Sequence, residues 1–131
     1  MEVLQARQAV IDVGTNSVKV LVADVHGGIV TPVFETSEQT RLGRGFYETH
    51  RLLPEPIAMT AAAVARYALQ ARTMGASRVR VVATSAARDA INREDLLGAI
   101  RAASGLEVEV ISGELEAQWG FAGVTSSPEM A

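Results

Sequence analysis

The sequence predicts an α/β fold, and two observations carry this prediction. Residues 8–40 are rich in Val and Ile and are interrupted by turn residues, which is typical of strands joined by hairpins. The remainder alternates segments of helical spacing with short β-branched segments. The resulting order is three strands, then helix, strand, helix, strand, helix. We expect the later strands to join the first in parallel through right-handed crossovers.

Three strands are expected before residue 41. The turn at Gly14–Ser17 separates the first from the second, and the turn at His26–Gly28 separates the second from the third. The next segment, RLGRGFYETHRL, contains two glycines and no clear periodicity, so it is expected to be a loop that ends at Pro54 and Pro56.

The longest helix is predicted over Pro54–Met74, because prolines suit a first turn and alanines favour helix throughout. Gly75 would end it. Its inward-facing residues repeat at a spacing of three to four: Ile57, Ala61, Val64, Ala68 and Ala71.

The second half continues the alternation. Arg78–Thr84 predicts a strand, and a second helix capped by Asn92 would run to Gly105. A last strand is expected over Leu106–Ile111, and a third helix is expected from Ser112 onward.

Composition restricts the class of protein. The chain has 131 residues, 48% of them hydrophobic and 21% charged, which fits one globular domain. The absence of cysteine excludes a disulfide scaffold and a thiolate metal site. A net charge of -3 argues against nucleic acid as a partner. The N-terminal segment carries charges and matches neither a signal peptide nor a membrane span, so we expect a cytoplasmic protein without a membrane partner.

The first candidate site is the segment DVGTNS, between the first two strands. A tight turn here would direct the amides of Gly14, Thr15 and Asn16, and the side chains of Thr15, Asn16 and Ser17, toward one anion. Asp12 would supply a hard oxygen ligand for a divalent cation that accompanies phosphate. The segment is neither a Walker loop nor a dinucleotide-binding motif. An ordinary hairpin turn explains the same residue types.

The second candidate site is ATSAARDA, where a strand passes into helical structure. Thr84 and Ser85 would lie at amides that favour an anion, and Arg88 could add a bidentate clamp. The alternative is that Thr84 or Ser85 only caps a helix and that Arg88 pairs with Asp89 or Glu94 on the surface.

The third candidate site is ISGELEAQW, which again follows a strand. Glu114 and Glu116 fall on different helix faces, so one of them could face a cleft and act as a general base toward water. Alternatively, both only complement the helix dipole in its first turn.

These three segments together resemble the exopolyphosphatases and guanosine pentaphosphate phosphohydrolases (Ppx/GppA), within the actin-like ATPase superfamily. The matching stretches are AVIDVGTNSVKVLVADV, TRLGRGF, VVATSAARDAINRED and VEVISGELEAQWGFAGV. The resemblance implies a ribonuclease H-like domain with a five-stranded mixed sheet. It also implies magnesium-dependent release of terminal phosphate from polyphosphate or guanosine pentaphosphate.

The resemblance further implies roles for single residues. Glu116 would activate water, and Asp12 would lie near the metal. The residues that would bind substrate phosphate are Gly14, Thr15, Asn16, Ser17, Thr84, Ser85, Arg88 and Arg41, with Arg44 in the same loop as Arg41.

The domain organisation is expected to be incomplete. Residues 1–124 would form the N-terminal domain, and residues 125–131 would lead toward a second domain of the same type that supplies the other side of the cleft. A homodimer is also possible, through apolar surface that a missing domain exposes. Two other interpretations stay open: a non-catalytic phosphate-binding or sensor module, and half of a sugar kinase or actin-like ATPase. The AARDA and SGELEA stretches argue against the latter.

Overall fold

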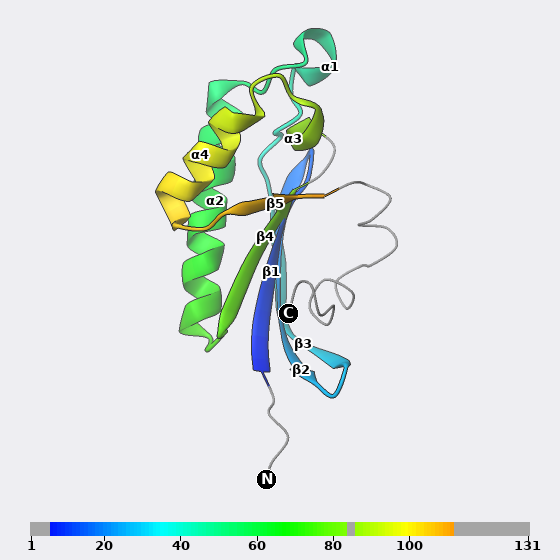
Figure 1. The fold of residues 1–131 in the computed structure, drawn as a ribbon, viewed down its shortest axis with the longest axis vertical. Helices are drawn as coiled ribbons and strands as arrows, with labels where there is room; N and C mark the ends of the chain where they lie inside the picture. The colour runs from blue at the N-terminus through cyan, green and yellow to red at the C-terminus, as the bar shows by residue number, and fades with distance from the viewer. Residues whose placement is uncertain (1–5, 84–85, 112–131) are drawn as a thin grey trace.

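The computed structural model describes residues 6–83 and 86–111. Figure 1 shows a twisted sheet with helices packed along one side. The elements in chain order are β1 (Ala6–Val13), β2 (Ser17–His26), β3 (Ile29–Gln39), α1 (Phe46–Thr49), α2 (Pro54–Thr73), β4 (Arg78–Ala83), α3 (Ala86–Asp89), α4 (Arg93–Ser104) and β5 (Val108–Val110).

The sheet has five strands in the order β3-β2-β1-β4-β5. The two hairpins pair β1 with β2 and β2 with β3 in antiparallel fashion. The crossovers place β4 parallel to β1 and β5 parallel to β4. The predicted α/β fold class with a five-stranded mixed sheet is therefore confirmed.

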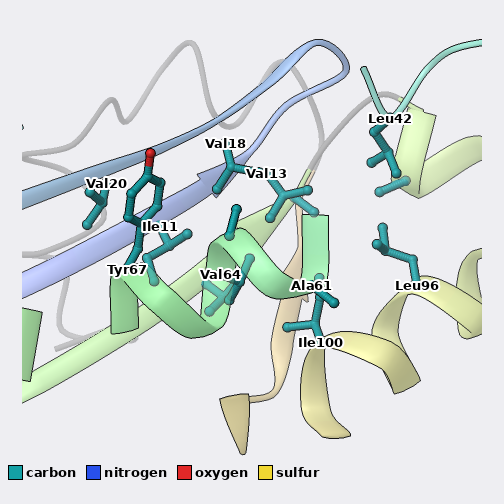
Figure 2. Close-up of a cluster of buried hydrophobic side chains, with 14 of the residues drawn as sticks. Ile11, Val13, Val18, Val20, Leu42, Ala61, Val64, Tyr67, Leu96 and Ile100 are labelled. Carbon is teal, nitrogen blue, oxygen red and sulfur yellow. The ribbon is translucent and has the colours of Figure 1, made fainter. Parts of the chain in front are cut away.

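The core lies between the sheet and the pair α2 and α4 (Figure 2). Ile11 of β1 is paired with Val20 of β2, so alternate residues of both strands point to the same helical layer. Val64 and Tyr67 of α2 pack there, and Ile100 of α4 closes the layer. Each such buried aliphatic side chain contributes about 1.5–3 kcal/mol relative to an exposed one.

The predicted positions of the two main helices agree closely with the structure. α2 begins with Pro54 at its first turn, and Gly75 follows it with a left-handed φ of 95°. Asn92 occupies the N-cap position of α4 as predicted, but its side chain makes no capping hydrogen bond to the first turn of the helix. Its amide instead exchanges two hydrogen bonds with the backbone of Leu52, at 2.8 and 2.9 Å, which fastens the start of α4 to the loop before α2.

Two short helices precede the two main ones: α1 was not expected, whereas helical structure directly after β4, where α3 lies, was predicted. α1 forms inside the glycine-containing loop, and α3 separates β4 from α4. Each has four residues, too few for a hydrophobic period to be visible in the sequence. The third predicted helix, from Ser112, lies outside the described residues. None of the helices within residues 6–83 and 86–111 has the length and apolar composition that crossing a membrane requires.

Candidate functional site

The parallel pairing of β1, β4 and β5 brings the ends of these strands to one edge of the sheet. Val13 at the end of β1 is in register with Ala83 at the end of β4. The N–H of Ile111, just after β5, donates to the carbonyl of Ala83 at 2.9 Å. Each of the three candidate segments follows one of these strands. Open α/β sheets bind ligands beyond such carboxyl ends, so this edge is where a site is expected.

The turn after β1 is closed by its own backbone. The N–H of Gly14 donates to the carbonyl of Ser17 at 2.9 Å. The Gly14 amide therefore closes the turn, and the prediction that it is directed at an anion is wrong. Ser17 begins β2 opposite Gln39 of β3. Within the described residues, no acceptor is found for the N–H groups of Thr15 and Asn16. Two successive amides at the tip of a turn are suited to an anion.

The segment after β3 folds back onto this turn. The carbonyl of Asn16 accepts hydrogen bonds from the N–H groups of Thr40 and Arg41, both at 3.1 Å. The carbonyl of Thr15 accepts from the N–H of Gly43 at 2.8 Å. Three backbone bonds therefore hold the turn and residues 40–43 as one unit, which we call the turn–loop unit (residues 14–17 and 40–45).

A pocket of about 440 Å³ lies in the turn–loop unit. The described residues that line it are Thr15, Asn16, Gln39, Arg41, Gly43 and Arg44. None of them is acidic, and two are arginines, whose planar forks match phosphate oxygens. Arg44 has a loose contact of 3.6 Å with the exposed carboxylate of Glu55. The pocket is therefore suited to an anion with several oxygens.

Sequence reasoning selected Thr15, Asn16 and Arg41 for this place but missed Gln39 and Gly43. Strand register could have found them. The antiparallel hairpin of β2 and β3 puts the end of β3 beside the start of β2, as the pairing of Ser17 with Gln39 shows. Whatever follows β3 must therefore lie next to the turn that precedes β2.

Asp12 lies one residue before the end of β1 and is half-buried. Its neighbours Ile11 and Val13 point into the core, so Asp12 faces the other side of the sheet, in register with Lys19 of β2. Within the described residues no group of three or more His, Asp or Glu side chains forms. Magnesium commonly takes one or two carboxylates and completes its shell with water and substrate phosphate, so a single carboxylate such as that of Asp12 is compatible with this ion.

Arg88 of α3 is engaged by its own neighbour. Its Nε and Nη2 donate to the two carboxylate oxygens of Asp89 at 3.0 and 3.2 Å. These hydrogen bonds lower the pKa of Asp89 and raise the pKa of Arg88. This is the surface pairing that we considered as the alternative for Arg88. Thr84, Ser85 and Glu116 lie outside the described residues.

Comparison with known proteins assigns the chain to a family. Residues 21–130 match the Ppx/GppA phosphatase family. The chain belongs to the Ppx/GppA phosphatase family. Exopolyphosphatase 2 of Mycobacterium tuberculosis is 44% identical over 89% of this chain and 40% of its own length. The crystal structure of the Aquifex aeolicus Ppx/GppA family member superposes with a TM-score of 0.83 at 32% identity, covering 96% of this chain and 41% of that chain.

The family assignment confirms the resemblance drawn from the four sequence stretches. The fold extends further: the ethanolamine utilization protein EutJ of Carboxydothermus hydrogenoformans has a TM-score of 0.53 at 15% identity, which is a likeness of fold alone. The chain spans about 40% of the length of the family relatives that it matches.

Proposed function

We propose that this chain forms the first domain of a phosphoanhydride hydrolase that releases terminal phosphate from inorganic polyphosphate. The observation that carries the proposal is the pocket of the turn–loop unit, which Arg41 and Arg44 line together with Thr15 and Asn16. Among the residues that the structure describes, none that lines the pocket is acidic, and the N–H groups of Thr15 and Asn16 have no acceptor. The chain's membership of the Ppx/GppA phosphatase family, and its similarity to a relative named exopolyphosphatase, support phosphate hydrolysis as the reaction class. Guanosine pentaphosphate offers the same oxygen chemistry and is the second substrate to test.

In this proposal the turn–loop unit binds phosphate oxygens. The negative charge of the phosphate oxygens would be neutralised by the backbone amides of Thr15 and Asn16, the Thr15 hydroxyl, and the guanidinium groups of Arg41 and Arg44. Such charge stabilisation is the main task in phosphoryl transfer. Arg88 would join them after exchanging Asp89 for phosphate. Ser17, Thr84 and Ser85 would add polar contacts at the same edge, and Asp12 would hold magnesium, which neutralises phosphate charge when bound.

Glu116 is the proposed general base. It follows β5, whose end lies at the same edge as the turn–loop unit through the bond between Ile111 and Ala83. A carboxylate there could orient and deprotonate the attacking water. The opposite side of the cleft would come from a second domain in the part of the relatives that this chain does not span.

Phosphate release by the full-length protein that contains this chain tests the proposal. Glu116→Gln should retain polyphosphate binding and lose about two to four decades of release rate. Glu114→Gln is the matched control, since it removes the same charge two positions away. Unchanged release in Glu116→Gln would remove Glu116 from the mechanism. Magnesium-dependent binding without any release from the unmodified protein would instead favour a phosphate-binding module.

A further inference from the structure

Gly43 is in unusually close contact with the turn of the turn–loop unit. Its N–H bonds to the carbonyl of Thr15, and a Cβ built on Gly43 would lie 2.3 Å from the Cγ2 methyl of Thr15. Real Cβ atoms are essentially never found so close to another heavy atom. The φ of Gly43 is not in the left-handed region, unlike that of Gly45 at 76°. Glycine is therefore required at position 43 by the neighbour it touches and not by its backbone conformation.

From this contact we propose that Gly43 is a positioning residue for the phosphate-binding turn, an inference that rests on the proposed function. The absence of a side chain lets residues 40–43 close onto Thr15 and Asn16. That closure fixes where the two open amides and the Thr15 hydroxyl point. The same closure carries Arg41 to the pocket, in a left-handed conformation with φ of 51°.

An alanine at position 43 leaves the chain two responses. The loop can move away from the turn, which stretches the 2.8 Å bond to Thr15 and the bonds to Asn16. Alternatively, Thr15 can rotate about χ1, which moves its hydroxyl from its present position. Both responses displace groups that would bind phosphate, and losing one charge-assisted hydrogen bond weakens binding about ten-fold or more.

A double-mutant cycle in the full-length protein that contains this chain separates this contact from general effects of the substitution. The variants are Gly43→Ala, Thr15→Ser and the two combined, because Thr15→Ser deletes the colliding methyl and keeps the hydroxyl. The readouts are the affinity for tripolyphosphate and the amide ¹H–¹⁵N shifts of residues 14–17. Gly98→Ala is the matched control, since nothing lies within 4 Å of a Cβ on Gly98 and its φ is also not left-handed.

We expect Gly43→Ala to weaken tripolyphosphate binding at least about ten-fold when Thr15 is present and less than about three-fold in the Thr15→Ser background. The amide shifts of residues 14–17 should move in the first case and little in the second, and Gly98→Ala should change neither readout. Equal losses in both backgrounds, or unaltered binding and shifts in Gly43→Ala, would overturn the inference.

Two further outcomes remain decisive. If Gly43→Ala does not fold but the double variant does, this rescue confirms the collision between a Cβ at position 43 and the Thr15 methyl. The positioning role of Gly43 then requires that the double variant and Thr15→Ser have the same amide shifts. If the unmodified full-length protein does not bind tripolyphosphate, the proposed function fails. The shift cycle still tests whether Gly43 positions the turn.

Discussion

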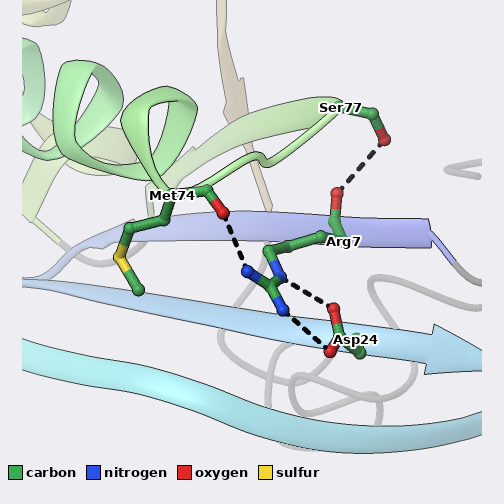
Figure 3. Close-up of polar contacts among 4 residues, drawn as sticks. All are labelled: Arg7, Asp24, Met74 and Ser77. Atoms are coloured by element: carbon green, nitrogen blue, oxygen red, sulfur yellow. Dashed lines mark hydrogen bonds and ion pairs between the residues drawn. The ribbon is translucent and has the colours of Figure 1, made fainter.

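The two ends of strand β1 use arginine in opposite ways. At the amino end, Arg7 donates through Nε and Nη2 to the carboxylate of Asp24 at 2.8 and 3.1 Å, and through Nη1 to the carbonyl of Met74 at 2.8 Å (Figure 3). The carbonyl of Arg7 accepts two bonds from Ser77. This arginine ties β1 to β2 and to the end of α2, and the hydrogen bonds to Asp24 raise its pKa.

At the carboxyl end, Arg41 and Arg44 line a pocket, and the closest carboxylate contact of these two arginines within residues 6–83 and 86–111 is the 3.6 Å approach of Glu55 to Arg44. An arginine that is matched by a bidentate carboxylate has its charge and donors committed to the fold. An arginine without such a partner keeps them for a ligand. The partner of each guanidinium group therefore distinguishes a structural arginine from one that is available to a ligand.

The largest effect should come from removing an arginine at the pocket end. Arg41→Gly deletes the fork and also relieves a left-handed backbone, which costs a residue with a side chain about 1–2 kcal/mol. The greater freedom of glycine in the unfolded chain offsets about 0.5–1 kcal/mol of that. We expect tripolyphosphate affinity to fall about 10- to 100-fold while the melting temperature stays the same or rises slightly.

Titration calorimetry and thermal melts on the same samples check this separation. Arg51→Gly serves as the control, because Arg51 is exposed, lies in a nearby loop and does not line the pocket. A parallel fall in stability and affinity for Arg41→Gly would mean that Arg41 supports the loop rather than the ligand.

The next effect belongs to the amino end and has the opposite signature. Arg7→Lys keeps the charge but cannot reach Asp24 bidentately and Met74 at the same time. We expect a melting temperature lower by several degrees, with tripolyphosphate affinity unaltered. Arg101→Lys is the control, since its 3.4 Å contact with Glu107 is a single exposed one. A loss of affinity in Arg7→Lys would contradict the division of roles between the two ends.

The fold was largely predictable because its signals are local. The alanine-rich period of α2 and the glycines that end α2 and α4 set the boundaries, and the order of elements set the parallel pairings. The turn at residues 14–17 was also visible as turn chemistry. These features depend on residues that are neighbours in the sequence.

The site was predicted only in part because it depends on contacts between distant segments. Gly43 owes its identity to Thr15, and the side chain of the N-cap residue Asn92 bonds Leu52 instead of the backbone of the first turn of its own helix. Gly14 has the residue type of an anion-binding turn, yet its amide closes that turn. A single sequence shows which side chains are available, whereas the partner that each one takes is fixed by packing.

The smallest effect should come from Arg88, which combines both behaviours, since it lies near the pocket end but is paired with Asp89. Asp89→Asn removes the bidentate acceptor and should raise tripolyphosphate affinity a few-fold by freeing the fork. Because the hydrogen bonds from Arg88 lower the pKa of Asp89, the Asp89 carboxylate stays ionised at pH values below the ordinary aspartate pKa of 3.8.

The affinity gain should therefore be constant between about pH 5 and pH 8, and the pairing should be lost only as pH falls through the lowered pKa. Glu94→Gln removes the same charge beside Arg93, whose contact with Glu94 is 4.0 Å. An equal gain in both variants would reflect net charge alone and would leave Arg88 as a surface arginine. A gain in tripolyphosphate affinity that is specific to Asp89→Asn, measured by calorimetry at two pH values, would show that Arg88 binds the ligand together with Arg41 and Arg44.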